Sequence, residues 1–153
     1  ARIVAAIAND GATVTPSLVR GFTLDGKTFS ERAPSYASSQ VLSPKTARQI
    51  QELMIGVVEE GSGRTARPMV GSAGGKTSSA QTGIMVGEGE NAKEIVHAWF
   101  AGFYPAQQPR YSIVVFVEGG ESGERVAAPI FKQIADGISA KEAALQEASV
   151  SSQ

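Results

Sequence analysis

Several features that mark particular protein classes are absent from this sequence or scarce in it. There is no cysteine, which excludes disulfides, thiolate nucleophiles and cysteine-ligated zinc. No apolar run approaches the about 18 residues of a membrane span, and no signal-peptide pattern is visible. The formal net charge is -1, so the basic excess typical of proteins that bind nucleic-acid backbones is missing. The single histidine, His97, has no cluster of metal-ligating partners, and we expect it to be structural rather than catalytic.

The composition is that of an ordinary globular protein. The chain has 153 residues, of which 42% are apolar and 19% charged, enough for one domain with a hydrophobic core. A helical pattern begins at Ala1 without a capping residue before it. We therefore expect the chain to be a piece of a longer protein.

The first third of the chain predicts one helix and short peripheral strands. Residues 1–8 place apolar side chains at helical spacing. Residues 12–19 alternate loosely around Pro16, which favours an edge strand. Asp25-Gly26 is a tight-turn signal and predicts a small hairpin between residues 21–24 and 27–29.

The clearest helix start lies at Ser43-Pro44. Serine is a favoured N-cap and proline fits the first helical position. The helix that follows should end at Gly61-Ser62-Gly63 and pack on a sheet, because an apolar stripe repeats at three-and-four spacing through Ile50, Leu53, Met54, Val57 and Val58.

The second half predicts three strands and a closing helix. Residues 76–86, 95–104 and 111–118 have strand character, and Pro129 stands at a helix start. After about Ala140 the chain turns polar, which we interpret as a frayed extension. Consecutive strands with short connections form antiparallel sheets, so the predicted fold class is α+β, an antiparallel sheet flanked by helices.

The stretch GSAGGKTSSAQTG, residues 71–83, gathers small residues around Lys76. One interpretation is a phosphate-binding loop, but that motif needs four residues between its two glycines, and Gly71 is one residue too close to Gly75. A second interpretation is a connecting loop with a solvated lysine. We expect Arg64 and Arg67, just upstream, to belong to a solvated linker rather than to border an anionic substrate.

A third interpretation is an acyl-transfer site on the edge of a sheet. Lys76-Thr77 followed by small residues matches the K-T-G signature of penicillin-recognising serine enzymes, whose other signatures are S-x-x-K and S-x-N. The chain resembles the C-terminal part of the transpeptidase domain of a class B, high-molecular-weight penicillin-binding protein. Five segments carry the resemblance in family order: RIVAAIANDG, LSPKTARQIQELMIGVVEEGSGRTA, AGGKTSSAQ, HAWFAGFYPAQQPRYSIVVFVEGG and VAAPIFKQIAD.

The resemblance implies roles for four consecutive residues. Lys76 would orient the substrate and tune the proton network beside the nucleophile, and Thr77 would bind the substrate's terminal carboxylate. Ser79 would share that carboxylate and supply a backbone N–H to the oxyanion hole. Ser78 stands where the family usually has glycine; we expect it to face away from Thr77 and Ser79, because side chains alternate along a strand, and to alter the site slightly.

Neither S-x-x-K nor S-x-N occurs in the chain. The resemblance therefore implies that residues 1–139 are the C-terminal portion of the domain, with residues 140–153 as a polar extension, and that an N-terminal portion of the same protein carries the nucleophile. It further implies peptidoglycan stem peptides and β-lactams as partners, no nucleic acid, no cofactor or metal, and a place on the outer face of the bacterial cytoplasmic membrane through an N-terminal anchor.

Three functions stay open from the sequence alone. The first is a serine D,D-transpeptidase that cross-links stem peptides and is acylated by β-lactams. The second is a non-catalytic β-lactam sensor of the same fold, and the third is an interaction domain without acyl chemistry. Lys76 and Thr77 are common to the first two, so the stretch does not separate them.

Overall fold

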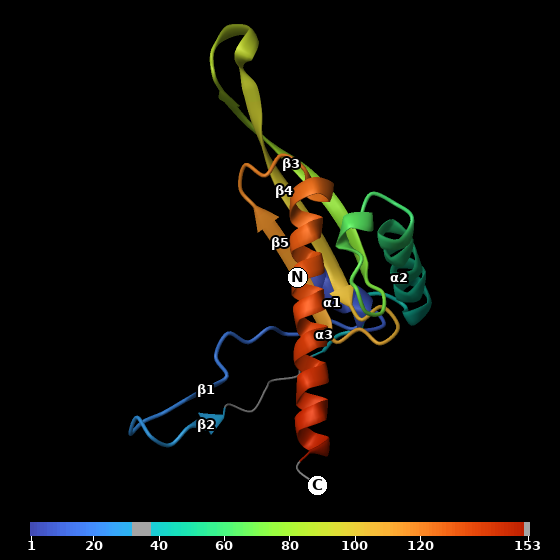
Figure 1. Cartoon of the computed structure of the whole chain (residues 1–153), viewed down its shortest axis with the longest axis vertical. Helices are drawn as coiled ribbons and strands as arrows, with labels where there is room; N and C mark the ends of the chain where they lie inside the picture. Colours follow the sequence, from blue (N-terminus) through green and yellow to red (C-terminus); the bar gives the residue numbers. More distant parts are fainter. Residues whose placement is uncertain (32–37, 152–153) are drawn as a thin grey trace.

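The computed structural model describes residues 1–31 and 38–151, and the irregular segment expected around Pro34 lies largely outside this part. The elements alternate as the sequence predicts: helix, peripheral strands, long helix, three strands, helix (Figure 1). In chain order they are α1 (Arg2–Ala8), β1 (Gly21–Phe22), β2 (Ser30–Glu31), α2 (Pro44–Glu59), η1 (Arg64–Ala66), β3 (Gly74–Val86), η2 (Gly89–Asn91), β4 (Lys93–Tyr104), β5 (Tyr111–Val117), η3 (Gly123–Ala127) and α3 (Ala128–Val150).

The main sheet has three antiparallel strands in the order β3-β4-β5. The register is continuous across it, since Thr77 pairs with Phe100 and Phe100 pairs with Val115. This confirms the predicted α+β class. It also places β3, the strand that holds Lys76, at one edge of the sheet.

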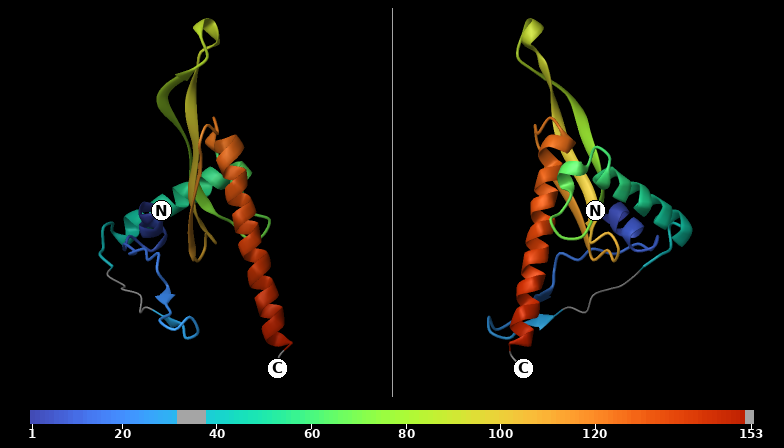
Figure 2. Two further views of the ribbon diagram at one scale, coloured as in Figure 1. Left: turned by 90° about the vertical axis from the view of Figure 1, so that its left-hand side faces the viewer. Right: turned by 45° about the vertical axis from the view of Figure 1, so that its right-hand side comes forward.

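Helices cover both faces of this sheet. The left view of Figure 2 shows the sheet edge-on, with α3 on one face and α1 and the N-terminal part of α2 on the other. The α3 face is closed by Phe100 and Phe131, whose ring centroids are 4.6 Å apart and whose side chains are fully buried. On the opposite face, Phe103 packs with Met54 of α2 and Ile7 of α1. The C-terminal end of α2 reaches the α3 side as well, because Val58 belongs to the core around Phe131.

Helix α2 begins where the sequence predicts. The Ser43 hydroxyl accepts a hydrogen bond from the Thr46 N–H at 3.1 Å, and Pro44 occupies the first turn. The helix ends at Glu59, before the Gly61-Ser62-Gly63 stop. The turn that follows carries the Ser62 side chain to β3.

Two peripheral predictions differ from the structure. The edge strand expected over residues 12–19 is wrong, because the described part contains only an isolated bridge between Ala12 and Gln40 there. The hairpin around Asp25-Gly26 exists, but its strands are only Gly21–Phe22 and Ser30–Glu31. The Asp25 carboxylate accepts backbone N–H groups from Lys27 and Thr28, so the turn takes up the residues that were expected to extend the strands.

The frayed extension expected after Ala140 is also wrong as far as Val150, since α3 continues unbroken to that residue. Two interactions attach this part of the helix to the sheet: Glu142 accepts from the Tyr111 hydroxyl at 2.7 Å and pairs with Arg110 at 2.9 Å. None of the helices in the described residues combines the length and apolar composition that crossing a membrane requires.

Candidate active site

The four residues Lys76, Thr77, Ser78 and Ser79 lie consecutively on β3, the edge strand. Strand β4 pairs with one side of β3, and no other strand among residues 1–31 and 38–151 pairs with the opposite side. An edge strand presents backbone donors and acceptors that are free to pair with another chain. The predicted site residues are therefore held on a rigid edge strand, which no strand of the described residues pairs with on its second side.

The strand register divides these residues between two faces. Thr77 lies opposite Phe100 and Ser79 opposite Ala98, both of which are buried on the α3 face. Ser78 lies opposite Trp99, on the other face, and is exposed. Directly paired residues share a face, so Thr77 and Ser79 point to one side and Ser78 to the other.

Each of the two hydroxyls on the α3 face has a partner from a different loop. The Thr77 and Ser62 hydroxyl oxygens are 2.9 Å apart, and Ser62 comes from the turn after α2. The Ser79 hydroxyl accepts the backbone N–H of Gly123, the first residue of η3, at 3.2 Å. Sequence reasoning missed Ser62 and Gly123, because it interpreted both as parts of element-ending turns and these contacts join segments 15 and 44 residues apart.

Lys76 supplies positive charge at this edge. Its side chain is exposed, and its ammonium group donates to the Thr77 carbonyl oxygen at 2.7 Å. Within the part of the chain that the structure describes, no carboxylate forms an ion pair with Lys76. The charge therefore remains available to an anionic ligand.

The glycines before Lys76 serve packing. A Cβ at Gly74 would lie 2.3 Å from the Phe103 ring, and one at Gly75 would lie 2.3 Å from the Phe100 ring. Contacts under about 3 Å are not tolerated in a packed core without movement. The small residues that drew attention in the sequence thus let two core phenylalanines lie against the strand.

Beyond the site, β3 and β4 continue as a two-stranded ribbon that projects past β5 (Figure 1). The register shifts between Gln81 and Met85. The Glu94 carboxylate holds this irregularity, because it accepts from the Gln81 amide at 2.8 Å and from the Gly83 N–H at 2.7 Å. The ribbon is therefore fixed to the site strand by charge-assisted hydrogen bonds.

Two nearby ionisable residues have structural contacts. His97 accepts the Gly119 N–H at Nδ1 over 3.1 Å, and its ring meets Phe116 edge-on. Arg67, expected to be solvated, is 60% exposed and also pairs with Glu59 at 2.7 Å. Neither contact directs these side chains toward the hydroxyls of Thr77 and Ser79.

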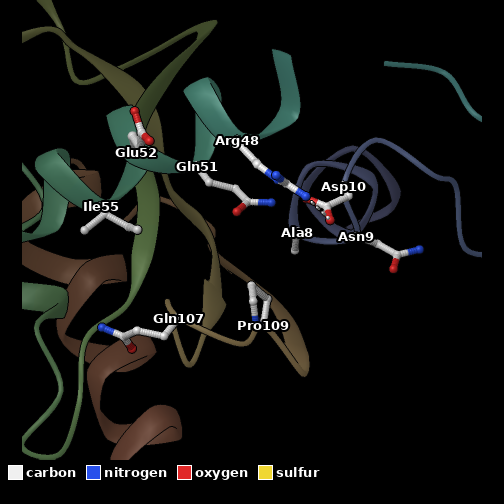
Figure 3. A pocket seen from close by; sticks show the side chains of 9 residues that line it. All are labelled: Ala8, Asn9, Asp10, Arg48, Gln51, Glu52, Ile55, Gln107 and Pro109. Atoms are coloured by element: carbon white, nitrogen blue, oxygen red, sulfur yellow. Dashed lines mark hydrogen bonds and ion pairs between the residues drawn. The ribbon is translucent and has the colours of Figure 1, made fainter. Parts of the chain in front are cut away.

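A cavity of about 470 Å³ lies elsewhere, between α1, α2 and the β4–β5 connection (Figure 3). Arg48 and Asp10 both line it and form an ion pair of 3.2 Å, and Gln51 donates to the Ile7 carbonyl. None of the four β3 site residues lines it. In the described part of the chain no three His, Cys, Asp or Glu side chains gather as a metal site would require.

Comparison with known families identifies the class of protein. The family model of the penicillin binding protein transpeptidase domain matches residues 1–136 of this chain. The chain therefore belongs to the penicillin-binding protein transpeptidase family, as the resemblance of its five ordered segments predicted.

Individual relatives agree with this assignment. The chain is 33% identical over 151 residues to the peptidoglycan D,D-transpeptidase PbpA of Mycobacterium tuberculosis, covering 95% of the chain and 28% of that protein. It is 34% identical over 137 residues to the stage V sporulation protein D of Bacillus subtilis, covering 86% of the chain and 21% of that protein. The chain thus spans between a fifth and a third of the length of these relatives.

Solved structures share the fold. Penicillin-binding protein A from M. tuberculosis, in an imipenem acyl-enzyme complex, superimposes with a TM-score of 0.70 at 29% identity, over 90% of this chain and 29% of that one. Apo penicillin-binding protein 3 from the same organism gives a TM-score of 0.72 at 27% identity, over 92% of this chain and 34% of that one.

Proposed function

We propose that this chain forms one wall of the active site of a serine D,D-transpeptidase, which cross-links peptidoglycan stem peptides and is acylated by β-lactams. The observation that carries the proposal is the Lys76-Thr77-Ser78-Ser79 run on an open edge strand, in a chain of the transpeptidase family. The relatives that are named peptidoglycan D,D-transpeptidases, and the acyl-enzyme complex of a similar structure, support it.

Each residue has a role that its surroundings allow. Lys76, exposed and without a carboxylate partner among the described residues, orients the substrate and tunes the proton network at the nucleophile. Thr77 and Ser79 lie on one face of the strand and donate to the substrate's terminal carboxylate, which needs donors and a nearby cation. The Ser79 N–H contributes to the oxyanion hole.

Ser78 occupies the position where the family usually has glycine, and it is exposed on the opposite face beside Trp99. Its side chain has room, since an exposed hydroxymethyl group displaces no core atom. We propose that Ser78 therefore alters the site slightly and leaves the two donors in place.

The nucleophile and its base belong to an N-terminal portion of the same protein that carries S-x-x-K and S-x-N. The absence of both patterns from the 153 residues supports this division, as does the 28% of PbpA that the chain spans. A nucleophilic serine requires an adjacent base, and residues 1–153 hold no matching pair. The proposed division is a C-terminal portion of the domain in residues 1–139 and an extension in residues 140–153; the family match over residues 1–136 supports that limit.

An exposed aromatic surface beside the site supports the N-terminal portion of the protein as a packing partner. Trp99 and Phe116 lie on the face opposite α3, with ring centroids 4.4 Å apart, and they are 37% and 47% exposed. Exposed apolar patches next to a functional site mark interaction surfaces. We propose that the N-terminal portion packs here and brings its serine to the edge of β3, in a protein that is anchored by an N-terminal segment to the outer face of the cytoplasmic membrane.

The test is fluorescent-penicillin labelling of the full-length protein. Replacing Lys76 with alanine should lower the acylation rate constant by about a hundredfold, the typical loss when one charge-stabilising group is removed from an active site. Lys93→Ala, on the projecting ribbon of the same sheet, is the matched control and should label like the wild type.

Unchanged labelling of Lys76→Ala would overturn the role of that lysine. Labelling of the wild type without any cross-linking of stem peptides would favour the β-lactam sensor. A wild-type protein that is not labelled at all would leave only an interaction domain.

A further inference from the structure

The two hydroxyls of the site are supported by a closed frame of hydrogen bonds from outside β3. Ser62, after α2, contacts the Thr77 hydroxyl at 2.9 Å, and Gly123, at the start of η3, donates to the Ser79 hydroxyl at 3.2 Å. A third bond joins the two supporting segments, because the Thr65 hydroxyl of η1 donates to the Glu124 carbonyl at 2.5 Å.

Packing makes this frame rigid. A Cβ on Gly123 would lie 2.4 Å from the Ser78 carbonyl oxygen and 2.6 Å from that of Trp99, so η3 rests directly on the backbone of β3 and β4. Ala66 of η1 and Ala127 of η3 are fully buried in the same core cluster. Neither supporting loop can move far without opening that core.

The donor and acceptor capacity of a hydroxyl group determines which partner donates in each hydrogen bond of the frame. A hydroxyl has one proton to donate and two lone pairs that accept. Because the Gly123 N–H can only donate, Ser79 accepts from it and keeps its own proton for a ligand. A carboxylate accepts only, so Thr77 also serves it best as a donor, and this requires Ser62 to donate to Thr77. Donors arranged in series polarise one another and strengthen the last bond.

We infer that Ser62 is a positioning residue: it orders the Thr77 hydroxyl as a donor toward the substrate's terminal carboxylate, while the Thr65–Glu124 bond keeps Ser62 and Gly123 in register. This inference rests on the proposed function, in which Thr77 and Ser79 bind that carboxylate. Ser62 itself touches no substrate in this scheme and acts only through Thr77.

The experiment compares two ligands on the full-length protein. One is a β-lactam with its free carboxylate, and the other is its methyl ester, which has no anion for Thr77 to bind. The discrimination ratio is the acylation rate constant for the acid divided by that for the ester. Ser62→Ala should lower the ratio about 5- to 10-fold, the effect of about one hydrogen bond. Ser62→Thr keeps the hydroxyl and should restore most of it.

Control variants separate this role from a structural one. Ser149→Ala, on the exposed end of α3, should leave the ratio and the unfolding temperature unchanged. Thr65→Ala should lower the ratio in the same direction as Ser62→Ala, by a smaller factor. An unchanged ratio in Ser62→Ala, or an equal loss for acid and ester, overturns the inference.

The same experiment also tests the proposed function separately, through the acid-to-ester ratio of a Thr77 variant. If Thr77→Ala leaves the acid-to-ester ratio unchanged, the carboxylate is not bound at Thr77 and the proposed site is wrong. If Thr77→Ala lowers the ratio and Ser62→Ala does not, the site stands and only the role of Ser62 is rejected.

Discussion

At the scale of single residues, the position of β3 depends on the absence of side chains at two glycines. Gly74 and Gly75 leave the space that the rings of Phe103 and Phe100 fill, and this fixes the strand just before Lys76. Thr77 and Ser79 then obtain their orientation from Ser62 and Gly123, two residues distant in the sequence. The proposed site residues therefore stand on a strand whose position the core determines.

This arrangement predicts the outcome of adding one methyl group. Gly75→Ala places a Cβ 2.3 Å from the Phe100 ring, so we expect a loss of about 1–3 kcal/mol of stability from overpacking. Gly137→Ala, in α3 with nothing within 4 Å of the added atom, should gain about 0.5–1 kcal/mol, because alanine is the better helix former. Chemical denaturation of the full-length protein measures both, and equal effects in the two variants would contradict the packing role of Gly75.

The sequence proposes candidate site residues and predicts the faces on which they lie, but it does not predict which residues contact them. Lys76, Thr77 and Ser79 follow from a short local pattern, and the alternation of a strand predicts their faces. Ser62 and Gly123 carry no such local signal, since a serine between two glycines and a glycine after a strand indicate turns. Only tertiary structure brings them to β3.

At the scale of elements, α3 is held by its sheet and also by the loop that leads to the site. Asp136 accepts from the Lys132 ammonium group, one turn earlier, and from the Met69 N–H at 2.7 Å. The Lys132 hydrogen bond is the larger cause that lowers the pKa of Asp136 below its ordinary value; the Met69 N–H adds to it, and burial opposes it. This carboxylate therefore connects the segment before β3 to the last helix.

A lowered carboxyl pKa in the folded state gives a defined pH dependence. The stability from Asp136 is present above the unfolded pKa of about 3.9 and is lost as the pH falls through that value toward the lower folded pKa. Asp136→Asn should therefore cost about 0.5–1 kcal/mol at pH 7, the scale of a partly exposed ion pair. The difference from the wild type should shrink between pH 5 and about pH 3. Thermal unfolding at a series of pH values measures it, and a difference that grows on acidification would reverse the assigned sign.

The elements themselves were largely predictable, and the errors have physical causes. The capped start of α2 and the three strands follow from local patterns. The error after residue 140 came from interpreting polarity as disorder, although KEAALQEA is rich in strong helix formers. The error over residues 12–19 came from relying on the alternation of apolar and polar residues alone. A strand forms only where another strand pairs with it.

At the scale of the whole molecule, one open strand edge and one exposed aromatic surface lie side by side. Ser78 on β3 is paired with Trp99 on β4, and Trp99 packs on Phe116 of β5. Because the chain spans only 28% of PbpA, the proposed partner for both features is the N-terminal portion of the same protein. In the proposed function, that portion would supply the nucleophile, and this chain would supply the groups that bind the carboxylate and the oxyanion.

The most direct measurement is peptide mapping of the acylated full-length protein by mass spectrometry. After reaction with a β-lactam, the adduct should lie on a serine outside residues 1–153, within an S-x-x-K pattern, and its yield should fall in Lys76→Ala. An adduct on any serine of this chain, Ser62, Ser78 and Ser79 included, would contradict the division of the active site between two portions of the protein.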